Sequence, residues 1–535
     1  PQPKDEMRLM KKDFLWWRDG IIYQVYPRSF ADSNNDGIGD LQGITSKLDY
    51  LHALGVDAIW LSPIYPSPDV DFGYDVADYC EIDPKFGTMQ DFEALLKEAR
   101  KRDIHVILDL VLNHTSDQHP WFIEAKKSKD NPYHDWYLWQ DPKPNGDPPN
   151  NWESWFGGPA WEYDPNLEQY YYHMFFKEQP DLNWRNPDVR AAMLDVFRFW
   201  LKKGVDGFRL DVFNAYFKDP EFKDNPSQFG IRAFDRQKHI YDVSQPEMFP
   251  LIQEIRAIMD KRKDTYIVGE TFLADPQQTA QYCGDGKLHA AFNLDFAQNR
   301  WHPKRFLRSA LRWYQSLSDN AWPNNFLSNH DMRRSATRYC LGEDDRRAKV
   351  AGAMLLTIKG TPFMYYGEEI GLRDIPIRKI SEVKDPVGKT FWPLFNGRDG
   401  CRAPMQWNDQ INAGFSPTQP WLPVHNNYPD RNVDQQITDP ESLLIFFKHI
   451  IKIRKEEPAL QRGDFIPLVK DPRHFLAFLR TYQDDQVLVV LNFSSRELIC
   501  DIPEGTWVPL FGEDKPNNGL ISLAPYDVRL FKKVD

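Results

Sequence analysis

The feature that most constrains the fold is an alternation of short apolar runs with longer amphipathic segments. Apolar runs typical of buried strands lie at residues 21–27, 58–61 and 105–114, and segments with helical patterning separate them at 41–54 and 89–102. A strand followed by a helix, repeated, is typical of parallel βαβ units, in which each crossover helix covers the sheet. The first part of the chain therefore predicts a parallel sheet covered by helices.

The same alternation resumes further along the chain. A helix is expected at 187–203, with Pro187 in its first turn and Gly204 just past its end. Five more strands are expected near residues 207–212, 266–271, 290–296, 326–331 and 362–366. Eight strands with helices between them predict the α/β class and a closed (β/α)8 TIM barrel.

Two irregular stretches and a change of pattern predict the domain organisation. Residues 115–181 are rich in Pro, Asn, Asp, Gly and Trp, and a structureless loop of that length is improbable, so an inserted subdomain is expected after strand three. Beyond residue 456 the pattern becomes short alternating strands, which predicts a C-terminal antiparallel β-sandwich. The expected parts are the barrel (1–114 and 182–456, with a second insertion at about 371–438 and a last helix from Asp439 to about Lys455), the subdomain (115–181) and the β-domain (457–535).

Composition excludes several classes of partner. The net charge of −12 argues against nucleic acid and anionic membranes, and no apolar run reaches the roughly 18 residues of a membrane span. The five cysteines are scattered without a C-x-x-C pair, and residues 1–13 lack the apolar core of a signal peptide, although the missing Met leaves room for a removed leader or tag. We therefore expect reduced thiols and a cytoplasmic location; the oligomeric state is not predicted.

The segment Gly207-Phe208-Arg209-Leu210-Asp211-Val212 carries the strongest chemical signal. The period of two along a strand places Arg209 and Asp211 on one face and the apolar residues on the other. A buried carboxylate beside a guanidinium is costly without a partner or a task. One interpretation is a structural ion pair; the other is an Asp nucleophile kept ionised by its neighbouring cation.

Polar residues follow the predicted strands at their carboxyl ends, where the active site of a (β/α)8 barrel lies. They are Asp109, Asn113, His114, Arg209, Asp211, Glu270, His330 and Asp331. Three acidic groups, Asp211, Glu270 and Asp331, converge from three strands, which packing alone does not explain because like charges repel.

This convergence predicts glycoside hydrolysis, in which two carboxyl groups roughly 5 to 5.5 Å apart give a retaining double displacement. Asp211 is expected as the nucleophile and Glu270 as the acid, with a pKa raised by partial burial. Asp331 is expected to accept hydrogen bonds from sugar hydroxyls, and His114 and His330 are expected to donate hydrogen bonds to them. Metal binding is the alternative for the histidines, but no second His stands at a ligand spacing.

The loop after the first strand predicts a cation site. Asp32, Asn34, Asp36 and Asp40 supply oxygens, Gly37 permits a sharp turn, and the Ile38 carbonyl fills a gap. The full EF-hand pattern needs a Glu at its twelfth position, where Gly43 stands, so a single-loop structural Ca²⁺ site is expected. A metal-free Asx-rich turn is the alternative.

The strand ends resemble glycoside hydrolase family 13, the α-amylase superfamily, over nearly the whole chain. The resemblance rests on the segments Asp109–His114, Gly207–Asp211, Gly269-Glu270 and Asn329–Asp331, while Gln179–Trp184 and the cation loop resemble the oligo-1,6-glucosidase branch. It implies a nucleophile role for Asp211, an acid/base role for Glu270 and transition-state stabilisation by Asp331.

Within that resemblance, Asp71 and Tyr74 match positions that hold the terminal glucose, Asp71 by hydrogen bonding and Tyr74 by stacking. The segment Arg398–Trp407 resembles a loop whose second arginine, Arg402, pairs with that Asp. Such a bridge closes the cleft behind one sugar and implies an exo-acting enzyme on short oligosaccharides or disaccharides. Arg398 is expected either at the substrate or in a structural pair with Asp399.

Linkage preference depends on the residues after the nucleophile. In the branch that the chain resembles, Val at position 212 accompanies α-1,6 activity, whereas Phe213–Phe217 resembles broader α-glucosidases that take maltose or sucrose. The prediction is an exo-α-glucosidase leaning to α-1,6 bonds. One alternative is a transglucosylase, sucrose isomerase or trehalose synthase-like enzyme, in which Arg333 and Arg334 would favour sugar binding; solvent or rim charges are the expected role of these two arginines. The other alternative is a non-catalytic amylase-like partner protein.

Overall fold

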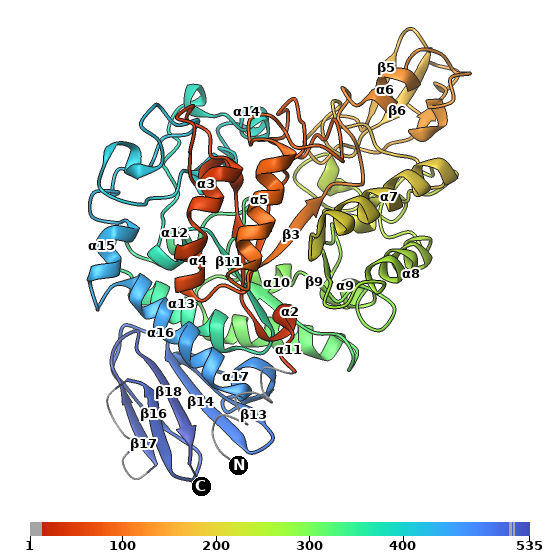
Figure 1. Ribbon diagram of the computed structural model, residues 1–535. Helices are drawn as coiled ribbons and strands as arrows, with labels where there is room; N and C mark the ends of the chain where they lie inside the picture. Colours follow the sequence, from red (N-terminus) through yellow and green to blue (C-terminus); the bar gives the residue numbers. More distant parts are fainter. Residues whose placement is uncertain (1–12, 513–515, 517–518, 535) are drawn as a thin grey trace.

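The computed structural model describes residues 13–512, 516 and 519–534 and has an eight-stranded parallel sheet at its centre (Figure 1). The strand order is β10-β11-β1-β2-β3-β7-β8-β9, and each recorded pairing in it is parallel. The strands are β1 (Ile22–Val25), β2 (Ala58–Leu61), β3 (His105–Leu110), β7 (Gly207–Leu210), β8 (Tyr266–Gly269), β9 (Ala290–Ala291), β10 (Asn324–Phe326) and β11 (Thr361–Tyr365). Side chains close the circle between β9 and β10, where the rings of Phe292 and Phe326 lie 5.3 Å apart. The prediction of a barrel is confirmed.

The sixth predicted strand is much shorter than its apolar run. Instead of 290–296, β9 covers only Ala290–Ala291, and α10 (Leu294–Ala297) begins directly after Asn293, whose side chain accepts a hydrogen bond from the Phe296 amide. An Asn cap competes with strand continuation because it satisfies a helix amide.

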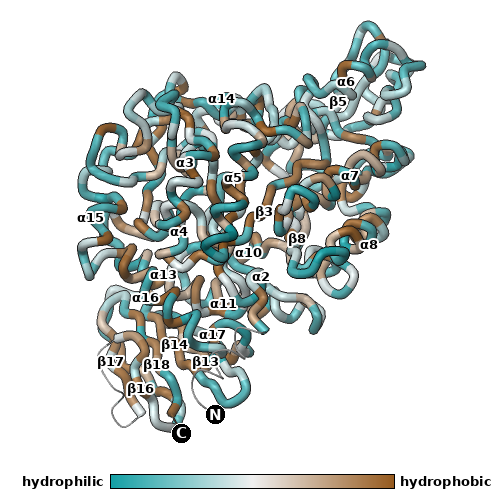
Figure 2. Tube along the Cα trace, in the orientation of Figure 1, coloured by the Kyte–Doolittle hydropathy of each residue, from teal (hydrophilic) through white to brown (hydrophobic). Residues whose placement is uncertain are grey.

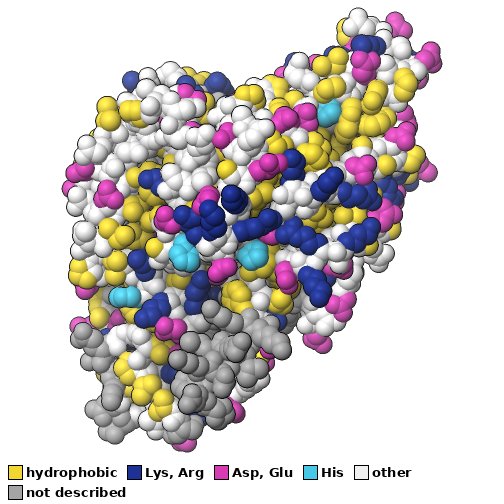
Figure 3. All heavy atoms as spheres, viewed as in Figure 1, with side chains coloured by type: hydrophobic (Ala, Val, Ile, Leu, Met, Phe, Trp, Pro, Cys, Tyr) yellow, Lys and Arg dark blue, Asp and Glu magenta, His cyan; other side chains and the backbone are white. Residues whose placement is uncertain are grey.

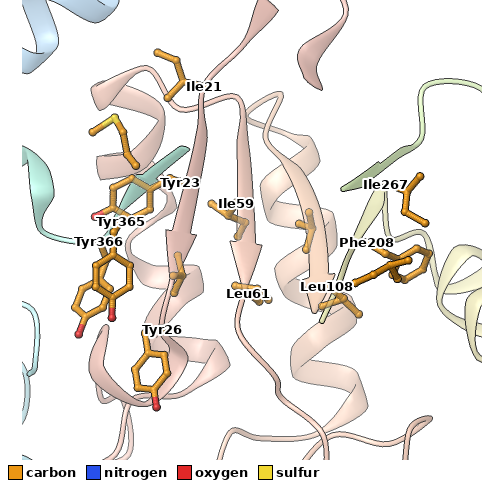
Figure 4. Close-up of a cluster of buried hydrophobic side chains, with 14 of the residues drawn as sticks. Ile21, Tyr23, Tyr26, Ile59, Leu61, Leu108, Phe208, Ile267, Tyr365 and Tyr366 are labelled. Atoms are coloured by element: carbon orange, nitrogen blue, oxygen red, sulfur yellow. The ribbon is translucent and has the colours of Figure 1, made fainter. Parts of the chain in front are cut away.

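Alternation along the strands separates two apolar layers. Interior positions such as Ile22, Trp60 and Ile107 form one buried cluster inside the barrel. The other face packs against the surrounding helices, and Figure 4 shows side chains of this second layer, among them Tyr23, Ile59, Leu61, Leu108, Phe208 and Ile267. Arg209 follows the interior period, and its guanidinium lies 5.2 Å from the centre of the Trp60 ring. The alternation that directs apolar side chains into the barrel therefore also places the charged side chain of Arg209 there.

Helices surround the sheet. The main ones are α3 (Leu41–Ser46), α4 (Leu48–Leu54), α5 (Met89–Arg100), α7 (Pro187–Lys203), α8 (Met248–Met259), α11 (Pro303–Ser316), α13 (Arg346–Thr357) and α16 (Leu443–Glu456). The predicted bounds of α7 are confirmed, with Gly204 at φ 103° as its cap. The helix expected at 41–54 divides at Lys47. The last barrel helix begins at Leu443 rather than Asp439, because the Ser442 side chain accepts from the Ile445 amide and caps it there.

The inserted subdomain and the C-terminal domain lie at opposite ends of the molecule (Figure 1). The subdomain contains α6 (Pro120–Ala125) and an antiparallel sheet of β4 (Trp139–Gln140), β5 (Trp161–Asp164) and β6 (Gln169–Tyr172). It leaves the barrel after β3 and returns before α7, as the composition predicted.

The C-terminal region forms two antiparallel sheets after α17 (Pro458–Arg462). One has the order β12-β13-β14-β18-β16, and the other pairs β15 with β17. An apolar cluster takes residues from both sheets, including Leu488 and Ile521, and Figure 2 shows hydrophobic colour along these strands. The strands are β12 (Asp464–Pro467), β13 (Phe475–Tyr482), β14 (Asp485–Asn492), β15 (Leu498–Asp501), β16 (Trp507–Phe511), β17 (Leu520–Leu523) and β18 (Val528–Lys533).

The surface carries charges of both signs, and Figure 3 shows lysines and arginines interspersed with acidic side chains on one face. Within the described ranges, no helix is both long and apolar enough to cross a bilayer. All five cysteines are free thiols, as the scattered spacing predicted.

Candidate active site

A cavity of about 1310 Å³ is lined by residues that follow several barrel strands. Seven of the predicted site residues line it: Asp71, Tyr74, His114, Asp211, Glu270, Asp331 and Arg398. Arg209, His330 and Arg402 lie directly behind these side chains and bind them. The structure thus brings the predicted catalytic and sugar-binding residues to one place.

Arg209 organises the carboxylates. Its Nη1 donates to Asp109 Oδ1 at 2.8 Å and to Asp211 Oδ1 at 2.7 Å, and its Nη2 contacts Glu270 Oε2. The guanidinium is fully buried, and its neighbouring negative charges raise its pKa despite that burial. Burying a cation is tolerable only with such compensation. The predicted ion pair with Asp211 is confirmed. The nucleophile role of Asp211 stays a prediction.

Asp211 directly follows β7 and lines the cavity, and a strained backbone turn comes after it. Val212, directly after it, has φ 34° and ψ 41°, a left-handed conformation that β-branched residues rarely adopt. Such strain concentrates at functional sites, where the surrounding structure enforces it. The turn leads into η3 (Phe213–Ala215).

Burial governs the charge of Asp211. The carboxyl is 7% exposed, and desolvation raises its pKa to about 6; Arg209 opposes the rise, and Asp109 and Asp331 add to it. The expectation that Arg209 alone keeps Asp211 ionised was therefore incomplete. The carboxylate is ionised mainly above about pH 6, because burial outweighs the single shared cation.

Glu270 follows β8 and lies beside the nucleophile. Its amide donates to the Leu210 carbonyl at 2.9 Å, and its carbonyl accepts from the Phe213 amide at 3.2 Å. A Cβ on Gly269 would lie 2.3 Å from the Phe213 ring, so glycine is needed there. Because one guanidinium binds both Asp211 and Glu270, their carboxylates are held within a few ångströms, the arrangement that a retaining mechanism requires.

Asp331 is held by two arginines. Its Oδ1 accepts from Arg398 Nη1 and from Arg402 Nη2, each at 3.1 Å, while its side chain stays 40% exposed. Burial acts to raise its pKa, but His330 and the guanidinium groups of Arg398 and Arg402 hold the pKa well below the ordinary range. Asp331 is therefore a fixed negative charge.

His330 is positioned to donate a hydrogen bond. Its Nδ1 lies 2.8 Å from Gln24 Nε2, so Nδ1 is the acceptor and the proton is on Nε2. That Nε2 has no hydrogen-bond partner among the described residues, and it lies 3.3 Å from Asp331 Oδ2. Burial lowers the pKa of His330 to about 3, which keeps the ring neutral. The predicted donation of a hydrogen bond from His330 to a sugar hydroxyl stays a prediction.

His114 lies in a denser network. Its Nε2 is 2.9 Å from the Tyr74 carbonyl, and its Nδ1 is 3.1 Å from Asn113 Nδ2. Asn113 in turn binds Asp181 and the buried Lys218, which link the subdomain exit to the barrel. A sugar hydroxyl would have to replace one of these bonds, so the hydroxyl-donor role of His114 stays a prediction.

The prediction that Arg402 pairs with Asp71 was wrong. Arg398 makes that pair, with its Nη2 2.6 Å from Asp71 Oδ1. Arg402 ends η7 (Asp399–Arg402) and donates instead to the His330 carbonyl at 2.7 Å and to Asp331. The short helix directs the second arginine behind Asp331, whereas the first remains beside Asp71.

The alternative pairing of Arg398 with Asp399 was also wrong. Asp399 Oδ2 accepts from the Lys384 and Asp385 amides. Arg398 is bound by Asp385, with Nε–Oδ2 at 2.8 Å and Nη2–Oδ1 at 2.9 Å. Sequence reasoning missed Asp385; its one signal was an Asp-Pro pair typical of a helix start, and it caps α14 (Pro386–Phe391).

Tyr74 is held face to face with His330, with the ring centres 5.1 Å apart at 4°. Its hydroxyl donates to Asp109 Oδ2 at 3.0 Å. Gln179 also reaches this corner, where its Nε2 is 3.0 Å from the Tyr74 carbonyl and 3.3 Å from Asp71 Oδ2.

Of the two arginines after Asp331, Arg334 differs from the expected solvent or rim charge, whereas Arg333 agrees with it. Arg334 is buried, stacks at 4.6 Å over the Tyr365 ring and donates to the Tyr366 carbonyl. Arg333 is exposed and bridges Asp374. Arg334 therefore packs against the end of β11 and is not a rim charge.

The loop expected to bind a cation, residues 32–40, is held in shape by hydrogen bonds between its own side chains and backbone amides. Asp32, Asn34 and Asp36 each accept a hydrogen bond from the amide two residues on. Asp40 accepts from the Ser33 and Gly43 amides and caps α3. Among the described residues, no three His, Cys, Asp or Glu side chains gather as a metal cluster. The loop still supplies oxygen donors alone, the chemistry that fits a hard cation.

Comparisons with known proteins agree with this geometry. Residues 24–463 match the family model "Alpha amylase, catalytic domain", and residues 465–530 match "Maltogenic Amylase, C-terminal domain". The chain is 42% identical over 541 residues to a "Probable alpha-glucosidase" of Rhizobium meliloti (98% of this chain, 96% of the relative). It is 39% identical over 524 residues to an "Oligo-1,6-glucosidase" of Parageobacillus thermoglucosidasius (92% of each).

Solved structures are similar over the same length. The α-glucosyl transfer enzyme XgtA superposes with a TM-score of 0.92 at 39% identity, covering 98% of this chain and 100% of that one. A point mutant of the trehalulose synthase MutB, in complex with Tris, superposes with a TM-score of 0.89 at 35% identity, covering 97% of this chain and 100% of that one.

Proposed function

This chain belongs to the alpha-amylase family of glycoside hydrolases. We propose that it is a retaining, exo-acting α-glucosidase. It releases glucose from the non-reducing end of short α-glucosides, with a preference for α-1,6 linkages. The observation that carries the proposal is that the guanidinium of Arg209 binds both Asp211 and Glu270. Asp331, which two arginines hold, lines the same cavity.

The residues divide the chemistry between them. The Asp211 carboxylate attacks the anomeric carbon, and the protonated Glu270 gives its proton to the departing oxygen. The resulting glucosyl ester is then hydrolysed by a water molecule, whose proton returns to Glu270. Asp331 accepts hydrogen bonds from sugar hydroxyls, and these bonds strengthen as the sugar ring distorts. The Nε2 proton of His330 donates to a neighbouring hydroxyl.

The exo-action rests on the Asp71–Arg398 pair. Asp71 is buried, and Arg398 ties it to Asp385 and Asp331 at the same time. This network closes the cavity behind a single sugar ring, and sugar hydroxyls can complete its hydrogen bonds. A longer chain can therefore enter only by its end.

Initial rates on isomaltose, maltose and sucrose test the proposal. We expect glucose release from all three, with the highest kcat/KM on isomaltose by about 10-fold, because one apolar contact near the scissile bond changes selectivity by that order. Cleavage of an oligosaccharide whose non-reducing end is blocked would contradict the exo-action. A product mixture dominated by sugar isomers would favour the transferase alternative.

Structural Ca²⁺ in the loop after β1 is also proposed. The side chains of Asp32, Asn34 and Asp36 and the Ile38 carbonyl would hold it, with Asp40 ordering the loop from behind. The ion would tie a loop that also accepts contacts from the 407–421 segment, as in the Asp32 amide donating to the Phe415 carbonyl at 3.2 Å. A cytoplasmic location is proposed on the five free thiols.

A further inference from the structure

A second pocket lies between the start of α6 and an exposed side of α7, and we call it the α6–α7 pocket. It is lined by side chains from residues 77–80, 119–121 and 192–202, and its volume is about 580 Å³. Small-molecule sites occupy roughly 300 to 1,000 Å³. Among the described residues, none lines both this pocket and the active-site cavity. Figure 1 shows α7 beneath the subdomain that carries α6, so the pocket lies where the subdomain meets the barrel helices.

His119 presents an unused hydrogen-bond donor to this pocket. The side chain is 5% exposed, and its Nδ1 accepts from the Trp121 amide at 3.1 Å, which caps α6. Because Nδ1 is the acceptor, the ring proton is on Nε2, which has no hydrogen-bond partner among the described residues. Burial lowers the pKa of His119 to about 3, so the ring stays neutral. An unpaired N–H at a buried position is unfavourable, and the pocket therefore favours a ligand with an oxygen near Nε2.

Two aromatic rings from different helices form the apolar part of the pocket. Trp121 and Phe199 line it, and both are partly exposed. The Trp121 ring lies 4.7 Å from Trp136 and 4.3 Å from His119, and the Phe199 ring meets Trp200 edge to face at 5.0 Å. Both rings are thus held by their neighbours and still expose apolar surface. A ligand with an apolar face gains by covering them.

The charged side chains at this pocket cancel one another. Asp78, Asp195, Arg198 and Lys202 line it and are exposed. Arg198 Nη1 lies 2.5 Å from Asp195 Oδ1, and burial raises the pKa of the Cys80 thiol to about 11, so that thiol is neutral. Without a net charge the pocket does not attract an ion. Donors and acceptors side by side suit hydroxyl groups, which both donate and accept.

We propose that the α6–α7 pocket is a second, non-catalytic sugar site that binds a neutral hexopyranose such as glucose. A pyranose ring has an apolar face, which covers Trp121 and Phe199. Its hydroxyls accept from His119 Nε2 and bond to the charged side chains around the pocket. A flat aromatic ligand covers the rings but has no groups for the polar side chains. The inference goes beyond the proposed function, because it requires neither Asp211 nor Glu270.

One side chain connects this pocket to the active site. Tyr79 lines the pocket, and its hydroxyl donates to the His114 carbonyl at 2.7 Å and to the Val111 carbonyl at 2.9 Å. His114 lines the active-site cavity. A signal from one cavity can therefore be transmitted to the other, and a test has to observe each cavity by its own reporter.

Fluorine NMR of the enzyme labelled with 5-fluorotryptophan provides the two reporters. Trp121 lines the α6–α7 pocket and Trp155 lines the active-site cavity, and Trp121→Phe and Trp155→Phe identify their signals. On titration with glucose, we expect the Trp121 signal to shift and to saturate below about 100 mM, as for a Kd in the millimolar range. A Trp121 signal that does not move, or that responds to benzyl alcohol but not to glucose, overturns the inference. Glucose release from isomaltose tests the proposed function separately.

A pair of alanine variants on α7 places the response in the pocket. Ala192 lines the pocket, so Ala192→Arg should fill it, abolish the Trp121 shift and leave the Trp155 shift unchanged. Ala191→Arg is the matched control, because Ala191 is exposed but does not line the pocket; both shifts should remain. If the Trp121 shift persists in Ala192→Arg, it is transmitted from the active site and the inference is wrong.

His119→Asn tests the unused donor without removing the helix cap. An Asn side chain still accepts from the Trp121 amide, so the melting temperature should change little. It lacks the Nε2 donor, so the glucose affinity reported by Trp121 should fall by about 3- to 10-fold, the effect of one lost hydrogen bond. An unchanged affinity would overturn the inference, because the free Nε2 proton is the observation that points to a ligand.

Discussion

Arginine is fully buried in two regions of this enzyme, and its partners differ between them. In the active site, Arg209 binds the carboxylates of Asp109, Asp211 and Glu270. At the junction of the barrel and the C-terminal domain, Arg454 and Arg480 are equally buried and donate to backbone carbonyls. Their acceptors include Leu356 and Thr357, the last carbonyls of α13.

The two regions show that the partners of a buried arginine decide whether it serves a reactive site or anchors a domain. Nearby carboxylates raise the pKa of Arg209, whereas burial lowers the pKa of Arg454 and Arg480. Among the described residues, the hydrogen-bond acceptors of these two arginines are backbone carbonyls. The helix C-terminus supplies partial negative charge and unsatisfied carbonyls, which is enough to anchor a domain. The groups around Arg209 are instead carboxylates, which carry a full negative charge and can react. The following changes test this distinction, from the largest expected effect to the smallest.

Asp211→Asn should remove the nucleophile and leave the fold. We expect kcat on isomaltose to fall by on the order of 10⁴ or more, as for other nucleophile deletions. The amide still accepts a hydrogen bond from Arg209, so the melting temperature should change little. Steady-state kinetics with calorimetry measure both. Activity within about tenfold of the parent enzyme would remove Asp211 from the mechanism.

Arg209→Lys and Arg480→Lys compare the two regions directly. An ammonium cannot reproduce the planar fork that binds two carboxylates, so Arg209→Lys should lower kcat/KM by about 10² to 10³. Arg480→Lys should leave kcat/KM unchanged and lower the free energy of unfolding by about 1 to 3 kcal/mol, because buried carbonyls lose donors. Denaturant unfolding and kinetics on both variants separate the effects. Equal loss of activity in the two would show that the regions do not differ as described.

The pH dependence should move activity and stability in opposite directions. Activity requires ionised Asp211, so kcat/KM should rise as pH increases through about 6. The folded pKa is raised above the ordinary value of about 4, so the folded state binds the extra proton. This group therefore contributes stability at low pH that is lost as pH rises through about 6. Asp211→Asn should remove that component of the stability profile; an unchanged profile would contradict the raised pKa.

Removal of the proposed Ca²⁺ should give the smallest effect, and it should change stability without changing activity. We expect a chelator to lower the melting temperature by roughly 1 to 4 °C, with the rate per folded molecule unchanged, because the loop after β1 lies outside the carboxylate cluster. Asp36→Ala should abolish the response to chelator. A loss of turnover without a change in melting temperature would indicate a catalytic ion.

Strand and helix placement was predictable because it depends on local period and capping. The period of two placed Arg209 and Asp211 on one face, and Pro187 with Gly204 bounded α7 correctly. The prediction was weaker where a cap decided the outcome, as at Asn293, which ends β9 early, and Ser442, which starts α16 late. A cap depends on one side-chain hydrogen bond and competes closely with alternatives.

The ion-pair partners could not be read from the sequence. Arg398 and Arg402 are four residues apart in an irregular insertion, and Asp385 lies 13 residues before the first of them. Which arginine reaches Asp71 depends on the path of the backbone through η7 and on the space left by His330 and Asp331. Long side chains can satisfy several pairings with little difference in local energy, so only the packed surroundings select one.

The sequence alone determined the barrel, its insertion after β3, the C-terminal sheets and the identity of Asp211, Glu270 and Asp331 as a converging set. These follow from hydrophobic period and from the rule that parallel strands open at their carboxyl ends. Tertiary structure decided which cation holds which carboxylate, how far burial raises the pKa of Asp211, and which residues line the α6–α7 pocket. Those properties depend on distances between segments remote in the chain, and electrostatic and contact energies are set by such distances.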